Sequence, residues 1–383
     1  MASNDPAGAD DRIAALDGLR GIAALVVVLF HCMLASPTIM GRSSPDGLPS
    51  PGWEWWAAHT PLHLLWAGPE AVVVFFALSG LVLTLPFLNG EQVWRAYYAR
   101  RLVRLYLPVW ASIAFTAALM VVLPRVASAA QSNWVHDRAT SLSTGAVAND
   151  ASLWSATVTL NAPLWSLHYE LLFSLLLPLY LWFALTLRRW WAAKFLTVFA
   201  VVGIGVLTHL DAVLYMPVFA IGVLLAVERE RIARRARTVL PWQWAILFAA
   251  AGVLLIVHWL GIPGEFLAAA VGAAILVVGV PHCRAAARVA CLPPAQWLGK
   301  RSFSLYLVHE PIVVTAILVT GATAPLVPVL IALPCSLALA ALMYAVVERP
   351  AHRLARRVGR GIEQRVRQRA QQTPLPNSEG LVA

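Results

Sequence analysis

Long apolar stretches, separated by short polar breaks, follow one another along the chain from Ile13 to Val347. An α-helix that crosses a membrane needs about 20 mostly apolar residues. The sequence supplies ten such stretches, at residues 13–35, 62–88, 105–124, 163–187, 195–209, 211–227, 242–260, 264–281, 302–320 and 325–347. The runs are continuous rather than alternating, which excludes a membrane β-barrel. The pattern therefore predicts an all-α fold, a polytopic membrane bundle of about ten transmembrane helices.

The composition excludes an ordinary soluble protein. Of the 383 residues, 60% are hydrophobic and 13% are charged, whereas soluble domains are about half apolar and a quarter charged. We expect three regions: an N-terminal segment (1–12), a membrane domain (13–347) and a basic, partly disordered tail (348–383). No small-residue cleavage site follows the stretch 13–35, so we expect this stretch to be an uncleaved span.

The basic residues indicate how the predicted spans are oriented. If the amino terminus is cytoplasmic, 26 of the 29 lysines and arginines fall in cytoplasmic segments, and the remaining three are Arg42, Arg125 and Arg138. Because basic loops stay in the cytoplasm, we expect both termini there, in a multi-pass protein of a bacterial cytoplasmic (inner) membrane. This topology explains the net charge of +10, so no nucleic-acid partner is expected.

Several motifs that mark cofactors or nucleophiles do not occur in the sequence. The four cysteines form no CxxC pair, and there is no HExxH, GxSxG, Walker A or GxGxxG motif. We therefore expect no metal site, no disulfide framework and no permanently bound cofactor. Candidate chemistry must then come from ionisable residues inside the apolar stretches, which are costly there and mark function.

The first span contains Arg20 and His31, eleven residues apart. Eleven residues make about three helical turns, so both side chains leave one face of the helix about 16 Å apart. Arg20 is then near the inner surface and His31 near the outer one. The alternatives are an ion pair between Arg20 and Asp17 and a structural His31 bonded to a backbone carbonyl.

Glu170 lies in the fourth span, in the run WSLHYE, at the depth predicted for His31. A buried carboxylate needs a partner, and a His31–Glu170 pair would fix the imidazole tautomer and make a base. The same pair could instead only hold two helices together. His168 could take either role, and Glu70, at the outer end of the second span, is a further acid or a helix cap.

Two more clusters are predicted near the inner surface. Arg100, Arg101 and Arg104 follow the second span beside Tyr106, and an arginine fork suits phosphate, although topology alone would also explain the charge. Tyr306 and His309, with Ser304 and Glu310, fall in the inner half of the span 302–320. We therefore expect them at an inner entrance rather than beside His31.

These residues resemble the acyltransferase-3 family of bacterial integral membrane O-acyltransferases, from Arg12 to about Arg353. The most specific motif of that family, an arginine and a histidine separated by ten residues in the first span, is met by Arg20 and His31. EAVVVFFALSG, YYARRLVRLYLP, WSLHYE, SFSLYLVHEP and VERP follow in family order. Five motifs in order are far more specific than any one of them.

The resemblance implies acyl transfer, often of acetyl, from a coenzyme A thioester to a hydroxyl of a glycan, a lipid-linked sugar or a secondary metabolite. His31, oriented by Glu170, would then be the base or be acylated itself. The residues assigned to the acyl-CoA donor are Arg20, Arg100, Arg101, Arg104 and Tyr106, and the supporting residues are Glu70, Ser166, His168, Tyr306 and His309. The alternative is a sugar or lipid transporter (flippase) without acyl transfer, for which no internal repeat gives support.

Overall fold

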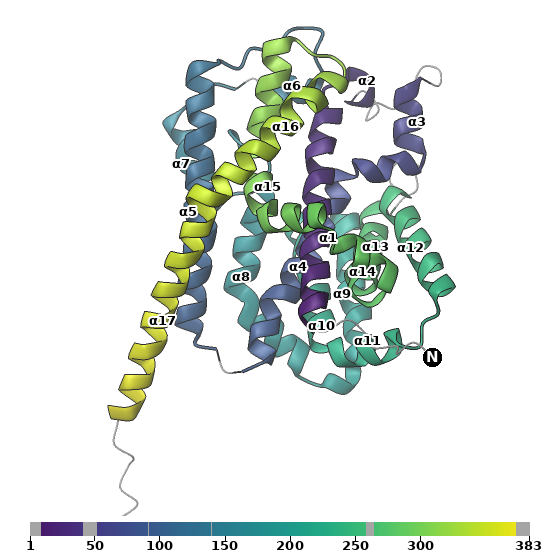
Figure 1. Cartoon of the computed structure of the whole chain (residues 1–383), viewed down its shortest axis with the longest axis vertical. Coiled ribbons are helices and arrows are strands. Elements are labelled where there is room, and N and C mark those ends of the chain that lie inside the picture. Colours follow the sequence, from purple (N-terminus) through teal and green to yellow (C-terminus); the bar gives the residue numbers. More distant parts are fainter. Residues whose placement is uncertain (1–8, 41–51, 91, 139, 258–263, 373–383) are drawn as a thin grey trace, which may run out of the picture.

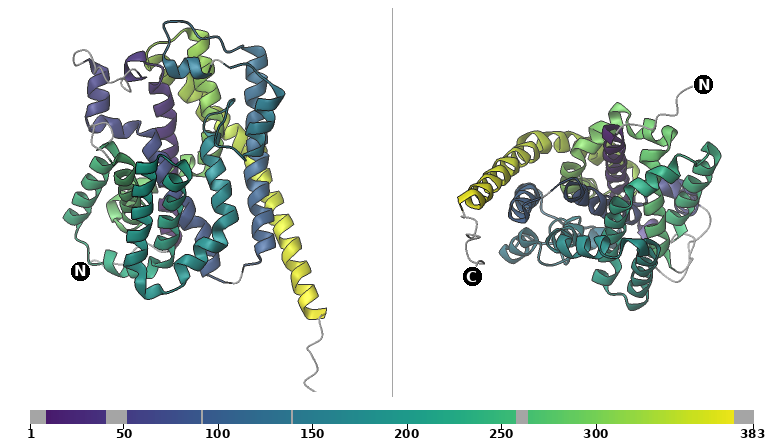
Figure 2. Two further views of the ribbon diagram at one scale, coloured as in Figure 1. Left: turned by 180° about the vertical axis from the view of Figure 1, so that it is seen from behind. Right: turned by 90° about the horizontal axis from the view of Figure 1, so that it is seen from below.

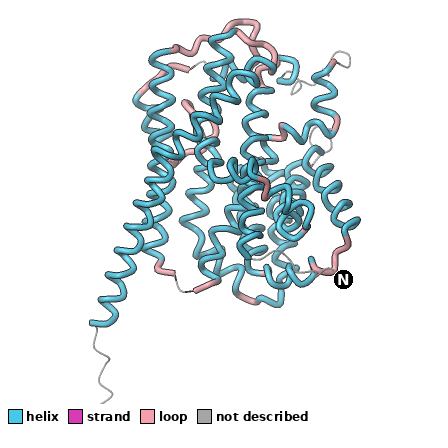
Figure 3. Tube along the Cα trace, viewed as in Figure 1, coloured by secondary structure: helices cyan, strands magenta, loops and turns pink. Residues whose placement is uncertain are grey.

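The structure, a computed structural model, describes residues 9–40, 52–90, 92–138, 140–257 and 264–372. In these ranges the chain is helical with connecting loops and contains no strand (Figure 3). The long helices are α1 (Ala9–Met33), α4 (Gly68–Leu88), α5 (Trp94–Val122), α8 (Leu164–Leu185), α9 (Trp191–Thr208), α10 (Asp211–Val227), α12 (Pro241–Ile256), α13 (Glu265–His282), α15 (Pro293–Thr320), α16 (Leu326–Met343) and α17 (Arg349–Gln372). The short elements are α2 (Pro37–Met40), α3 (Trp53–His59), η2 (Pro61–Leu65), α6 (Asn133–Arg138), α7 (Thr144–Ser152), η3 (Arg188–Trp190), α11 (Arg229–Ala236), α14 (Arg284–Ala290) and the π-helical η5 (Tyr344–Glu348).

The predicted all-α membrane bundle is confirmed (Figure 1). All ten predicted spans fall on helices, although residues 258–260 of the seventh lie outside the described residues. Within the described ranges, eight helices are long and apolar enough to cross a membrane, or nine if α10 and α11, bent by 70°, form one span. The predicted number is higher because α10 and α12, with 17 and 16 residues, are shorter than the about 20 residues of a straight crossing.

Two close helix crossings organise the bundle. A Cβ atom on Gly21 of α1 would lie 2.3 Å from the backbone nitrogen of Gly299 in α15, and one on Gly222 of α10 would lie 2.0 Å from the Ala77 carbonyl oxygen in α4. Small residues let helix backbones approach in this way. The α1–α15 crossing brings Arg20, the neighbour of Gly21, directly against α15.

The segment between α7 and α8 turns back into the bundle. Leu160 and Asn161 are fully buried, and the Asn161 amide donates to the Leu307 carbonyl oxygen at 2.8 Å. That carbonyl is free because its usual helical partner would be the missing N–H of Pro311. As a result α8 starts inside the bundle and lies lower than α1 (Figure 1).

The last helices form one long, bent rod. Helix α16 continues through η5 into α17, which packs along α5 and extends beyond the rest of the bundle (Figure 2). The expected tail after Glu348 is therefore helical as far as Gln372, and residues 373–383, where we expected disorder, lie outside the described residues. The beginning of α1 and the end of α17 point toward the same end of the bundle (Figure 1).

Candidate active site

A polar cavity of about 150 Å³ lies between α1, α4, α5, α8, α15 and the η5–α17 junction. Its charged lining consists of three arginines and two glutamates, together with one histidine: Arg20, Arg101, Arg104, Glu170, Glu348 and His352. The hydroxyl groups of Ser79, Ser166, Ser302 and Tyr306 also line it. Four candidate site residues from the sequence therefore share one cavity with Arg20 and Tyr306. They are Arg101, Arg104, Ser166 and Glu170.

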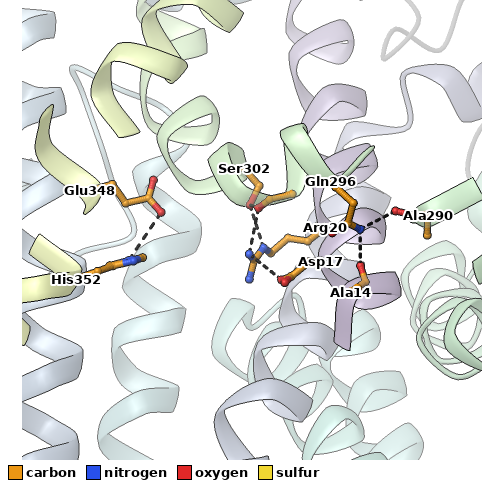
Figure 4. A network of polar contacts seen from close by, with 9 residues as sticks. Ala14, Asp17, Arg20, Ala290, Gln296, Ser302, Glu348 and His352 are labelled. Carbon is orange, nitrogen blue, oxygen red and sulfur yellow. Dashed lines mark hydrogen bonds and ion pairs between the residues drawn. The ribbon is translucent and has the colours of Figure 1, made fainter. Parts of the chain in front are cut away.

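The ion pair considered as the alternative for Arg20 is present. The Arg20 guanidinium contacts Asp17 at 3.0 Å, as the i,i+3 spacing allows. It also donates to Ser302 Oγ at 2.9 Å (Figure 4) and to the Gly299 carbonyl oxygen at 3.1 Å. Gln296 reinforces the same crossing by donating to the Ala14 carbonyl oxygen at 2.7 Å. The α1–α15 crossing thus holds Arg20 at the cavity wall.

Glu170 pairs with Arg101, which corrects the expected His31–Glu170 pair. The Arg101 guanidinium lies 2.5 Å from Glu170 Oε1 and also donates to Ser174 Oγ at 2.9 Å. Ser79 donates to the same carboxylate oxygen at 3.3 Å. The expected depth of Glu170 assumed that α8 begins at the membrane surface. Because α8 begins inside the bundle, Glu170 lies deeper, at the level of Arg101.

His31 meets His309 instead, with 3.2 Å between His31 Nδ1 and His309 Nε2. Both rings are buried, and Trp134 from α6 packs against His31 with 5.7 Å between ring centroids. The expected position of His309 at an inner entrance is therefore wrong. Helix α15 begins at Pro293, nine residues before the predicted span, so His309 lies in its far half.

The carbonyl contacts assign the tautomers of the two imidazoles. Nδ1 of His309 donates to the Leu305 carbonyl oxygen at 3.0 Å, so its Nε2 carries the lone pair. That lone pair accepts from Nδ1–H of His31, which also lies 2.9 Å from the Val27 carbonyl oxygen. Nε2 of His31 is therefore left unprotonated, the form that a general base or nucleophile requires.

Tyr306 connects the cavity with the histidine pair. Ser166 Oγ donates to the Pro163 carbonyl oxygen at 3.0 Å, so it accepts from the Tyr306 hydroxyl at 2.6 Å. The Tyr306 ring lies 5.8 Å from the His309 ring, measured between centroids. Tyr306 thus lines the cavity with its ring next to that of His309, which in turn contacts His31.

Glu348 and His352 belong to the site but were not singled out from the sequence. Glu348 Oε2 accepts from the Ser304 hydroxyl at 2.5 Å, and Oε1 lies 3.8 Å from His352 Nε2. The π-helical turn of η5, a frequent feature of functional sites, ends at Glu348 and directs its carboxylate toward Arg20 (Figure 4). The VERP motif was the signal that could have identified Glu348.

The structure places the other predicted site residues outside the cavity. Arg100 pairs with Glu363 of α17, and the Tyr106 hydroxyl donates to the Ser152 carbonyl oxygen at 2.7 Å. His168 contacts the Leu153 carbonyl oxygen at 2.8 Å through Nδ1. Glu70 is buried in the first turn of α4. Of the expected donor residues, the cavity contains Arg20, Arg101 and Arg104.

Comparison with known proteins identifies the family. The acyltransferase-3 family model, described as an acyltransferase domain, matches residues 13–345, which include every residue of the cavity except Glu348 and His352. No curated protein and no solved structure matches the chain. Because the match covers most of the sequence, the chain belongs to the acyltransferase-3 family of membrane acyltransferases.

Proposed function

We propose that this protein is an O-acyltransferase of a bacterial cytoplasmic membrane. It moves an acyl group, most simply acetyl, from cytoplasmic acyl-CoA to a hydroxyl of a glycan, a lipid-linked sugar or a secondary metabolite. The family supports acyl transfer. The observation that carries the proposal is the unprotonated Nε2 of His31, held by His309, just beyond an arginine-lined cavity.

The cavity suits the narrow part of an acyl-CoA donor. Sites for drug-sized ligands occupy about 300–1,000 Å³, so a cavity of about 150 Å³ fits the acyl group and its thioester better than the nucleotide. Arg104 lines the cavity and is exposed, which leaves its guanidinium free to bind a donor phosphate. Arg20 and Arg101 are each paired with a carboxylate, so Arg104 carries the excess positive charge of the cavity lining.

His31 then acts as the general base. Its Nε2 takes the proton of the acceptor hydroxyl while the hydroxyl oxygen attacks the thioester carbonyl carbon. The bond from that carbon to the CoA sulfur breaks, and His31 returns the proton to the departing thiolate. His309 accepts from Nδ1–H of His31, so the charge that forms on the imidazole is shared between two rings.

Tyr306 is placed to assist this step. It lines the cavity, and its ring lies next to that of His309. When the donor enters, the Tyr306 O–H turns from Ser166 to the thioester oxygen and stabilises the negative charge that develops there. Ser166, which accepts from this hydroxyl at 2.6 Å, holds the phenol in position before the donor enters.

A labelling experiment tests the proposal. Full-length protein in nanodiscs is incubated with radiolabelled acetyl-CoA and an envelope extract of the source bacterium, and label is counted in the glycan, lipid and small-molecule fractions. We expect protein-dependent label in one fraction. This label should survive washing and be released by mild base, as an ester is. Protein-dependent movement of sugar or lipid across liposomes without labelled product would support the transporter alternative and contradict the proposal.

A further inference from the structure

A second and larger pocket lies at the end of the bundle where α1 begins. Its volume is about 510 Å³, within the range of sites for small molecules. Residues of α1, α4, α10, α11 and α13 line it, and none of them belongs to the cavity described above. We call it the α11 pocket, and it does not form part of the donor passage.

Most of the lining of the α11 pocket is apolar. Five helices contribute aliphatic side chains, which include Ile13, Leu16, Leu85, Leu225, Ile232 and Val277. At the depth of a bilayer such a wall suits a hydrocarbon chain, because it offers that chain no polar group to hydrogen-bond.

The rim of the α11 pocket is basic. It contains Arg12, Arg229, Arg234 and Arg237 with a single acidic residue, Glu230, so the positive charges exceed the negative by three. Guanidinium groups bind phosphate oxygens through paired hydrogen bonds. A basic rim over an apolar wall is complementary to an amphiphile that has a phosphate head and an acyl chain.

Helix α11 is built to lie at this boundary. It bends by 70° from α10, and Glu228, which is buried at the bend, contacts Arg231 at 3.0 Å. Arg229 donates to the Asn89 side chain at 3.3 Å and so links α11 to the end of α4. Its sequence RERIARRA places Ile232 and Ala233 in the pocket and arginines on either side, as in interfacial helices.

We propose that the α11 pocket binds one anionic phospholipid of the surrounding leaflet, with an acyl chain against the apolar wall and the phosphodiester at Arg234 and Arg237. Anionic lipids are favoured over zwitterionic ones because the rim carries excess positive charge. This inference does not depend on the proposed acyl transfer, because the pocket and the catalytic cavity share no residue.

Native mass spectrometry of the full-length protein in detergent tests the proposal. Phosphatidylglycerol and phosphatidylcholine with identical chains are titrated separately, and apparent dissociation constants are obtained from the bound fractions. We expect phosphatidylglycerol to bind at least about tenfold more tightly, and Arg234→Gln/Arg237→Gln to remove that preference. The matched control is Arg365→Gln/Arg367→Gln, which removes the same charge from exposed positions of α17 and should leave the preference unchanged.

Further arms identify the ligand chemistry. Ala233→Trp fills the apolar part of the pocket and should weaken both lipids; if this variant does not fold, the arginine variants decide the outcome. The proposal would be overturned if the two lipids bind equally tightly. It would also be overturned if both double variants lose the preference for phosphatidylglycerol to the same extent. It would also be overturned if inorganic phosphate competes as well as the lipid, or if long-chain acyl-CoA displaces phosphatidylglycerol at lower concentration.

Discussion

His309 Nε2 lies 3.2 Å from His31 Nδ1 and accepts a hydrogen bond from its N–H. This relationship fixes which nitrogen of His31 is free for chemistry, because an imidazole that donates through Nδ1 presents an unprotonated Nε2. In many enzymes a carboxylate takes the role that His309 has here. A neutral partner leaves the buried pair without net charge until a proton is taken from substrate.

The first prediction concerns His309 as a positioning residue. His309→Leu removes the acceptor for His31 Nδ1–H and should lower the turnover number for acyl transfer at least about tenfold. His309→Gln offers a side-chain oxygen to the same N–H and should recover much of the rate. If His309 had a purely structural role, both variants would lose rate and thermal stability in parallel. We expect instead that the Gln variant recovers the rate of transfer, which the Leu variant does not.

The Arg101–Glu170 pair should be structural as well as part of the cavity. The two side chains are 14% and 19% exposed, so removing one partner leaves a mostly buried charge, which costs up to about 3–5 kcal/mol. Arg101→Gln and Glu170→Gln should each lower the melting temperature in detergent, and the double variant should lose less than the two single losses added together.

The Arg100–Glu363 pair provides the comparison. It is more exposed, at 25% and 29%, and pairs of this kind contribute about 1 kcal/mol or less. Arg100→Gln should therefore change the melting temperature little. Strict additivity of Arg101→Gln and Glu170→Gln would show that the two groups do not interact in the folded protein.

Arg104 should act on donor binding. A charge-assisted hydrogen bond contributes about 1.5–3 kcal/mol, so Arg104→Gln should raise the KM for acyl-CoA at least about tenfold and change kcat little. Steady-state kinetics with varied acyl-CoA separate the two constants. Arg100→Gln, one turn away and paired with Glu363, is the control, and an Arg104→Gln enzyme with normal KM would remove Arg104 from this role.

The α1–α15 crossing should be intolerant of a single methyl group. A Cβ atom on Gly299 would lie 2.3 Å from the Asp17 carbonyl oxygen, so Gly299→Ala must separate the helices and displace Arg20. We expect a loss of about 1–3 kcal/mol with a fall in transfer activity, measured by thermal unfolding and labelled transfer. Gly361→Ala on α17, where the added atom meets nothing within 4 Å, should reduce neither quantity.

The bundle could be predicted because hydropathy reports membrane spans directly. Ten apolar stretches located the helices, and the spacing of Arg20 and His31 placed both correctly on α1. Two features of local conformation could not be predicted from the sequence. The entry of Leu160 and Asn161 into the bundle, which lowers α8, has no hydropathy signal. The extension of α15 back to Pro293 passes through the polar run QWLGKRS, which hydropathy assigns to a loop.

These two features decided which side chains met. Because α8 starts inside the bundle, Glu170 lies beside Arg101 and not beside His31. Because α15 starts at Pro293, His309 lies at the depth of His31. Sequence spacing gives depth along one helix but not the rotation of one helix relative to another, so it could name the ionisable residues without giving their partners. Glu348 was missed because it stands at the boundary where the apolar pattern ends.

The central claim is that Nε2 of His31 takes the acceptor proton, and His31→Gln tests it most directly. Rates of labelled acyl transfer are measured for the wild type, for His31→Gln and for His59→Gln, a histidine that makes the same Nδ1 contact to the carbonyl oxygen four residues earlier, at 3.1 Å. We predict that His31→Gln loses at least about a hundredfold in kcat while it keeps its melting temperature and acyl-CoA binding, and that His59→Gln is normal. Transfer by His31→Gln at the wild-type rate would contradict the account.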